Sequence, residues 1–563
     1  MRMRAPLSGR IVLVSDAGGS VFEAGQNRLQ YELVALVGAT AVVVLAAALP
    51  GAQARVNAGP FALAVPANEG SLVAGISADG RYVLFASFAS NLVAGDTNNV
   101  WDVFVRDRVA KTTERVSVSN GGAQANGLDG TISANGRFIA FLSDAANVVA
   151  GDTNKTSDVF VRDRVAKTTQ RVSVSTGGAQ ANGESFLGSI SGNGRFVSFS
   201  SGASNLVPGD TNNARDTFVR DRAAGTTERV SVNSGGAQAN GESGSGRISG
   251  DGRFVAFGSR TSNLVAGDTN DTRDVFVRDR AAGTTEQVSV SGAAAGSEIN
   301  LTSISADGRY LAVEVPDSAF VIGGLVYVLD RVAKTSELVS VNSSGGRIAE
   351  WSGHGGLSAD GRFVVLDTGA FVRGESEGLE FGDVFVRDRV TKTTERISVN
   401  DNGKGGNAGS ISGVISADGR YVPFQSNASN LVAGDTNVCG DEGDHFNCSD
   451  VFVRNRVAGT TTLVSVGRTQ APPMQRLLLH PWPARSGRAL TATALVSVVS
   501  ARVTCTATLA GRKLQASEHS YRDYTARCVW KVPKNARGKQ LKGSLTVTTP
   551  SGTAAKRFTG TVR

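Results

Sequence analysis

Residues 91–108 read NLVAGDTNNVWDVFVRDR, and closely similar phrases begin at Asn147, Asn205 and Asn263. A second phrase, S-[AG]-[DN]-G-R-[YF], occurs seven times, with its arginines 53 to 58 residues apart. Self-similarity at such a period predicts a repeat protein in which each unit forms one supersecondary block. The seven arginines are Arg81, Arg137, Arg195, Arg253, Arg309, Arg362 and Arg420.

One unit contains enough apolar runs for four short antiparallel strands. In the second unit these strands are expected at 131–133, Phe138–Ser143, 158–162 and 170–175. Asn135-Gly136, between the first two, is a dipeptide that favours tight hairpin turns. Seven such units predict an all-β chain whose residues 71–467 form a seven-bladed β-propeller.

The repeat also resembles a known family. ISADGRYVLFAS at 76–87, followed by DVFVRDR and ERVSVS, resembles the TolB-type propeller repeat, which spells S-P-D-G-[KR] where this chain has Ala or Gly in place of Pro. The resemblance covers 71–467 and implies the propeller fold. Such propellers act as scaffolds, as binding modules and less often as enzymes, so the fold does not choose among these functions.

The two ends of the chain differ from the repeats. Residues 33–49 are apolar and precede Ala52-Gln53-Ala54, a pattern typical of a signal peptide or N-terminal anchor over 1–54, with 55–70 as a connecting segment. No membrane span is expected after cleavage. Beyond a linker at 468–474, alternating strand-like runs over 475–563 predict a small β-sandwich that resembles bacterial immunoglobulin-like domains.

Charge and cysteine content suggest where the protein works. Residues 468–563 hold 17 Lys and Arg against Glu518 and Asp523, a net charge of +15, whereas the repeats are acidic. We expect this basic domain to bind an anionic wall polymer rather than nucleic acid. The cysteines form two local couples, which predict disulfides and a secreted or cell-envelope location. The couples are Cys439 with Cys448, and Cys505 with Cys528.

The GDTN loops are the first candidate site. D-x-N-x-x-x-D offers three oxygen-bearing side chains in one loop, as a calcium site requires, although the loop lacks the Gly and distal Glu of an EF-hand. The alternative is that these side chains cap the loop by hydrogen-bonding its own backbone. The candidate ligands are Asp96, Asn98, Asp102, Asp152, Asn154, Asp158, Asp210, Asn212, Asp216, Asp268, Asn270 and Asp274.

Two further features concern contacts. The alternating charges of VFVRDR, such as Arg106, Asp107 and Arg108, predict ion pairs between blades. Units five and six drop the GDTN loop, and Trp351 and His354 lie between them, so this segment is a candidate contact surface.

Catalytic motifs are scarce. None of the four histidines recurs with the repeats, and neither G-x-S-x-G nor H-E-x-x-H occurs. We therefore expect a secreted, non-catalytic propeller that binds a protein or glycan at the cell envelope. The alternative is a secreted hydrolase or lyase with its site at a mouth of the propeller.

Overall fold

The computed structural model is an all-β protein with two compact units, Met1–Ala62 and Leu63–Arg563. In the first unit, β1 (Ala35–Gly38) and β2 (Ala41–Val44) form an antiparallel pair. A search of the described residues found no helix with the length and apolar character that a membrane crossing requires. The described residues are 35–38, 41–44, 65–270, 272–290, 297–316, 324–348, 352–368, 382–435, 438–439, 446–467, 477–495, 502–522, 525–549 and 552–563.

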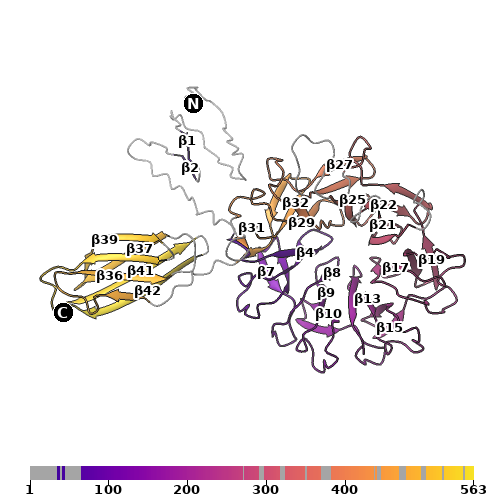
Figure 1. Ribbon diagram of the computed structural model, residues 1–563, viewed down its shortest axis with the longest axis horizontal. Helices are drawn as coiled ribbons and strands as arrows, with labels where there is room; N and C mark the ends of the chain where they lie inside the picture. The colour runs from indigo at the N-terminus through magenta and orange to yellow at the C-terminus, as the bar shows by residue number, and fades with distance from the viewer. Residues whose placement is uncertain are drawn as a thin grey trace, which may run out of the picture. The chain divides into compact units, whose positions relative to one another are not determined.

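Seven four-stranded antiparallel blades follow one another, as the sequence predicts (Figure 1). Blades 5 and 6 are linked into one sheet by a single residue pair, Gly324 with Ser352. Blades 1 to 3 are β4 (Ser71–Ile76), β5 (Tyr82–Ser87), β6 (Asp102–Asp107), β7 (Thr112–Arg115); β8 (Gly130–Ile132), β9 (Phe138–Ser143), β10 (Asp158–Asp163), β11 (Thr168–Arg171); and β12 (Ser185–Ile190), β13 (Phe196–Ser201), β14 (Asp216–Asp221), β15 (Thr226–Arg229). Blades 4 to 7 are β16 (Arg247–Ile248), β17 (Phe254–Ser259), β18 (Asp274–Asp279), β19 (Thr284–Val288); β20 (Asn300–Ile304), β21 (Tyr310–Pro316), β22 (Gly324–Asp330), β23 (Thr335–Leu338); β24 (Ser352–Leu357), β25 (Phe363–Thr368), β26 (Val384–Asp388), β27 (Thr393–Arg396); and β28 (Ser410–Ile411), β29 (Tyr421–Ser426), β32 (Asp450–Asn455), β33 (Thr460–Leu463). A short hairpin, β30 (Val438–Cys439) with β31 (Phe446–Asn447), lies between β29 and β32.

Apolar side chains on the second and third strands build the core. Phe85 of β5 and Phe104 of β6 are fully buried and stack with ring centroids 5.6 Å apart. The same phenylalanine pair recurs in blades 2, 3, 4 and 7 at 5.6 to 5.9 Å. Core clusters of the propeller join neighbouring blades: in one of them Leu84 and Val103 of blade 1 pack with Phe141 of blade 2. Blade sheets are therefore covered on both faces, which explains their nearly unbroken apolar strands.

A closed chain of backbone hydrogen bonds runs through the seven blades. In each S-[AG]-[DN]-G-R phrase the N–H of the Ala or Gly donates to the carbonyl oxygen at the same position of the next blade, over 2.8 to 3.1 Å. A proline here, as in the TolB-type spelling, would have no N–H to donate. The donors in chain order are Ala78, Ala134, Gly192, Gly250, Ala306, Ala359 and Ala417, and Ala417 donates back to Ala78.

Residues before the first blade complete the last one. β3 (Val65–Pro66) pairs with β34 (Val466–Gly467) at the end of blade 7. The N–H of Ala67 donates to Ser465 O at 2.9 Å, as the N–H of Ala125 donates to Ser117 O after the fourth strand of blade 1 at 3.0 Å. Residues 65–67 thus supply for blade 7 the segment that follows the fourth strand in the other blades. The sequence analysis did not foresee this pairing.

The glycine of each phrase is required by backbone and packing together. Gly80 has φ of 73°, in the region that favours glycine. A Cβ there would lie 2.1 Å from the ring of Tyr421 in the preceding blade. On the same ring lies the guanidinium of Arg108, 4.4 Å from its centroid. Arg108 Nη1 also donates to Gly80 O at 2.6 Å, so glycine and arginine together hold the neighbouring blade's aromatic ring.

The prediction of ion pairs between blades from VFVRDR holds for only part of the motif. The second arginine does bridge blades: Arg164 of blade 2 pairs with Glu114 of blade 1 at 3.2 Å. The aspartate does not. Asp107 forms its ion pair with Arg81 of its own blade, at 2.7 Å, because the register of β5 and β6 brings both to the same strand end.

The C-terminal domain consists of two four-stranded sheets that share one core. The first has the order β35 (Leu478–His480), β36 (Ala489–Leu495), β40 (Thr525–Lys531), β39 (Ala516–Arg522), and the second has the order β38 (Arg512–Leu514), β37 (Arg502–Leu509), β41 (Gln540–Thr549), β42 (Gly552–Thr561). Trp530 of β40 is fully buried and meets Phe558 of β42 at 5.6 Å between ring centroids. A disulfide between Cys505 of β37 and Cys528 of β40 joins the two sheets.

Candidate functional site

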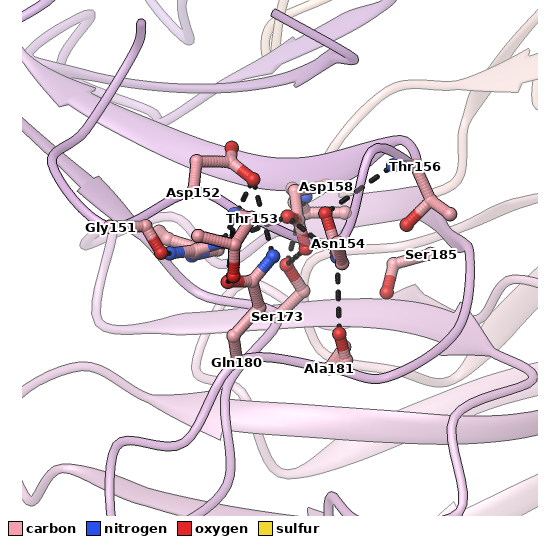
Figure 2. A network of polar contacts seen from close by, with 12 residues as sticks. Gly151, Asp152, Thr153, Asn154, Thr156, Asp158, Ser173, Gln180, Ala181 and Ser185 are labelled. Carbon is pink, nitrogen blue, oxygen red and sulfur yellow. Dashed lines mark hydrogen bonds and ion pairs between the residues drawn. The ribbon is translucent and has the colours of Figure 1, made fainter. Parts of the chain in front are cut away.

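In blade 2 the GDTN side chains lie close to Asp158 and Ser173 (Figure 2). Nη1 of Arg171 lies 3.3 Å from Asp152 Oδ1 and 3.0 Å from Asp158 Oδ2. Asn154 Nδ2 donates to Asp158 Oδ2 at 3.1 Å, and Ser173 Oγ donates to Asp158 Oδ1 at 2.5 Å. Arg171 therefore ties the loop to the fourth strand, while Asn154 and Ser173 supply the other two hydrogen bonds that Asp158 accepts.

The same arrangement is present in blades 1 and 3. Arg115 Nη1 lies 3.0 Å from Asp96 Oδ1 and 3.2 Å from Asp102 Oδ2, and Asn98 donates to Asp102 at 3.1 Å. In blade 3 the corresponding residues are Asp210, Asn212, Asp216, Arg229 and Ser231. The structure thus brings together all nine candidates of these three blades.

Burial is the largest influence on the pKa of the first aspartate in each cluster, which is Asp96, Asp152 or Asp210. It raises the pKa of Asp96 above its usual value, although the nearby Arg115 acts in the opposite direction. The pKa of Asp102 is raised for the same reason, against the hydrogen bond from Ser117. Each cluster places one guanidinium between two desolvated carboxylates, so in blades 1 to 3 the geometry favours a self-contained loop cap over calcium ligation. Within the described part of the chain, no group of three or more His, Cys, Asp or Glu is arranged to hold a metal ion.

The arginine was missed in the sequence analysis, although a signal for it exists. It stands two residues before the serine of the R-V-S-V phrase. In blade 1 the strand register pairs Arg115 with Phe104 of the third strand, and in blade 4 the same register pairs Gln287 with Phe276. Blade 6 keeps the pair as Asp383 and Arg396, whose Nη2 lies 2.8 Å from Asp383 Oδ1.

The remaining blades lack the arginine, and blade 5 lacks the aspartate as well. In blade 5 leucine replaces each partner, at Leu325 and Leu338. Blades 4 and 7 keep the aspartate but have Gln287 and Leu463 in place of the arginine. In blade 7, burial raises the pKa of Asp435 to about 6.

Several predicted residues cannot be placed. Trp351 lies outside the described residues, and His354 is described only as backbone within β24. Cys448 is disulfide-bonded, whereas the side chain of its predicted partner Cys439 lies outside the described residues.

Exposed apolar side chains gather at the end of the blades where the GDTN loops emerge. In blade 1 the register pairs Ser71 with Ser87 and Ser87 with Asp102, which places Leu72, Phe88 and Trp101 at the same strand ends. Phe88 and Trp101 form an edge-to-face pair with centroids 6.1 Å apart.

Neighbouring blades extend this surface. Leu128 of blade 2 follows Gly127, whose N–H donates to Trp101 O at 2.8 Å. Phe186 of blade 3 is covered by the guanidinium of Arg215 at 4.3 Å, and Ile411 occupies the corresponding inner-strand position in blade 7. Leu72, Phe88, Leu128 and Ile411 are 37 to 58% exposed. We call Leu72, Phe88, Trp101, Leu128, Phe186 and Ile411 the apolar arc.

Among the described residues, the apolar arc draws its members from blades 7, 1, 2 and 3. The corresponding inner-strand positions in blades 4 to 6 are Gly244, Asn300 and Gly353. An exposed apolar patch with an aromatic pair at its centre is typical of a binding surface. The repeat framework is therefore specialised on one side of the propeller.

A buried carboxyl lies at the junction of blades 6 and 7. Asp367 of β25 is 2% exposed and accepts hydrogen bonds from the N–H groups of Ser412, at 2.5 Å, and Gly413, at 3.2 Å. Burial raises its pKa to about 7 against these hydrogen bonds. Glu314 stands at the matching position of blade 5, and burial raises its pKa as well.

Comparisons with known proteins bear on the fold alone. No protein-family model matches the chain, and no curated protein sequence matches it. Among solved structures, the chain is similar to an oligogalacturonate lyase from Vibrio parahaemolyticus, at 12% identity and a TM-score of 0.41 over 71% of this chain and 94% of the lyase. It is also similar to a TolB-type protein from Agrobacterium tumefaciens, at 14% identity and a TM-score of 0.31 over 48% and 80% of the two chains. A third similar structure is the tricorn protease, at 10% identity and a TM-score of 0.30 over 87% and 54% of the chains.

Proposed function

We propose that the protein is a non-catalytic, extracytoplasmic β-propeller of the TolB-like type that binds a partner at the cell envelope through the apolar arc. The observation that carries this proposal is the pair of the exposed Phe88 and the half-buried Trp101, with aliphatic neighbours on adjacent blades. Trp, Phe and Arg are enriched at the centres of protein interfaces, where a few such residues supply most of the binding energy. A protein segment is therefore the favoured ligand, with a glycan as the second class.

The experiment compares the full chain with Trp101→Ala in a pull-down from envelope extract and on a glycan array. Loss of one aromatic anchor should weaken binding by at least tenfold, since such truncations commonly cost about 2 kcal/mol. Val109 is a matched control because it is exposed but lies at the opposite strand ends. Retention by Trp101→Ala of every partner bound by the unmodified chain would reject the arc as the binding surface.

The C-terminal domain is proposed to form a second binding surface, separate from the apolar arc. It is proposed to be immunoglobulin-like and to hold anionic wall polymer, because its basic residues are exposed, among them Lys531, Lys534 and Lys539. Binding to a polyphosphate-type polymer should weaken steeply as salt rises from 50 to 500 mM, roughly as screening predicts. Salt-independent binding would speak against a charge-based contact.

A hydrolase or lyase is the second candidate for the whole chain. The supporting observation is Asp367, whose pKa near 7 suits a general acid or base. Its two backbone hydrogen bonds instead indicate a strut between blades 6 and 7. Screening the chain and Asp367→Asn against polysaccharide substrates separates the two: turnover that the substitution abolishes would establish an enzyme.

A further inference from the structure

Blade 4 keeps the acidic loop of its neighbours but has lost the arginine that neutralises it. Register places Gln287 opposite Phe276, where Arg115 stands opposite Phe104 and Arg229 opposite Phe218. Gln287 brings a neutral amide in place of a positive charge. Blade 4 therefore keeps Asp268 and Asp274 but has no arginine at the position that lies between the two carboxylates in blades 1 to 3.

A buried oxygen in this blade has no partner. Asp274 pairs with Ser259 as Asp102 pairs with Ser87, so the two aspartates are equivalent. Asp274 is 4% exposed, and its Oδ2 is buried without a hydrogen-bond partner. In blades 1 to 3 the same Oδ2 accepts from both the arginine and the asparagine of the cluster.

The loop itself keeps its local shape. Asn270 Oδ1 accepts a hydrogen bond from Thr272 N at 3.2 Å, as Asn154 Oδ1 accepts from Thr156 N at 3.3 Å in blade 2. Thr272 Oγ1 is buried without a partner, and so is the equivalent Thr156 Oγ1 of blade 2, so this atom does not distinguish blade 4. Blade 4 thus presents a buried carboxylate oxygen, Asp274 Oδ2, where blades 1 to 3 have a guanidinium against the equivalent atom.

We propose that blade 4 binds a divalent cation of the calcium class, with Asp274, Asp268 and the amide oxygen of Gln287 among its ligands. Calcium accepts carboxylate, amide, carbonyl and water oxygens in flexible geometry, so two carboxylates with neutral donors form a suitable set. The ion would supply the positive charge that arginine supplies in blades 1 to 3. Calcium binding would then be a property of an arginine-free blade rather than of every GDTN loop.

The test measures calcium stoichiometry by isothermal titration of the full chain, together with its melting temperature in calcium and in chelator. Gln287→Arg restores the arginine of the other blades and should lower the stoichiometry by one while raising the melting temperature in chelator. Asp274→Asn should also remove one ion. Asp216→Asn is the matched control, since it alters the equivalent carboxylate in blade 3, where Arg229 already lies 3.1 Å away, and should leave the stoichiometry unchanged.

The outcomes are distinguishable. Loss of one ion in Gln287→Arg with retention in Asp216→Asn supports the site, and it does so even if Asp274→Asn fails to fold. Equal stoichiometry in the unmodified chain and Gln287→Arg, including no binding in either, would overturn it. A melting temperature that rises with calcium equally in both chains would place the ion elsewhere and overturn it as well.

Discussion

At the scale of single residues, the seven blades differ in whether they keep the buried ion pair between the aspartate of the third strand and the arginine of the fourth strand. Blades 1, 2, 3 and 6 retain both aspartate and arginine, whereas blade 5 replaces both by Leu325 and Leu338. Losing both partners leaves no buried charge, while losing only the arginine strands a desolvated carboxylate. The pair in blade 1, Asp102 and Arg115, is therefore best tested by single and double substitution.

We expect Arg115→Leu to lower the free energy of unfolding by about 3 kcal/mol, because it leaves two buried carboxylates without a cation. Asp102→Leu combined with Arg115→Leu reproduces the blade 5 pair and should cost less than Arg115→Leu alone. Urea unfolding monitored by circular dichroism measures both. If the free energy lost in the double variant equals the sum of the losses in Asp102→Leu and Arg115→Leu, the two residues are not coupled.

The arginine–aspartate pairs at the opposite strand ends predict behaviour in acid. Hydrogen bonds from Arg81 lower the pKa of Asp107 to about 2, and the equivalents in blades 2 to 5 are lowered to about 2 as well. A carboxyl whose pKa is lower in the folded state stabilises the fold above its ordinary pKa near 4. That stabilisation is lost as pH falls through about 2.

Stability in urea should therefore decline between pH 4 and pH 2, and Asp107→Asn should make the decline shallower. Blade 7 already holds the neutral version, since Arg420 Nε donates to Asn455 Oδ1 at 3.3 Å. Asn455→Asp is the reverse control and should steepen the decline. An unchanged slope in both variants would show that these pairs are not coupled to folding.

At the scale of elements, the sequence was informative wherever its signal repeated. Strand number, blade count and the tight turns were predictable because each S-[AG]-[DN]-G-R phrase marks the same hairpin. The bonding of those turns across blades was not, because a hydrogen bond between residues 56 positions apart, such as Ala78 to Ala134, leaves no trace in local pattern. The apolar arc was missed for a related reason: Leu72, Leu128 and Ile411 read as ordinary strand residues until the register shows them at exposed strand ends.

The backbone bonds across blades give a prediction for Ala134. Ala134→Pro removes the N–H that donates to Gly192 O at 2.9 Å and should destabilise the propeller by about 1–3 kcal/mol. Ala134→Ser keeps the N–H and should cost much less. Thermal unfolding by calorimetry compares the two. Equal melting temperatures for both variants would mean that the bond contributes little to holding blades 2 and 3 together.

At the scale of the whole molecule, closure of the propeller depends on a few residues before the first blade. Ala67 is fully buried, and its N–H bonds Ser465 O just as Ala181 bonds Ser173 in blade 2. Asn68 N donates to Asn91 Oδ1 at 3.1 Å, as Asn182 does to Asn205. The phrase PAN at 66–68 therefore plays the part of QAN in the repeats, on the other side of the closing junction.

We accordingly predict that a chain beginning at Ser71 is less stable than one beginning at Leu63. The shorter chain loses β3, the buried Ala67 and several hydrogen bonds, among them those from Ala67 N to Ser465 O, from Asn68 N to Asn91 Oδ1 and from Asn91 Nδ2 to Pro66 O. We expect these losses together to cost about 3 kcal/mol. Because both chains lack residues 1–62, the comparison isolates residues 63–70. Calorimetry should show a lower propeller transition in the shorter chain, and the cost should fall on blade 7, where hydrogen exchange of Val464 and Val466 would accelerate. Exchange that accelerates equally in all blades would instead indicate that the ring opens as one cooperative unit. An unchanged melting transition would contradict the prediction and show that the hydrogen bonds from Ala417 to Ala78 and from Ser71 to Ser449 suffice to close the propeller.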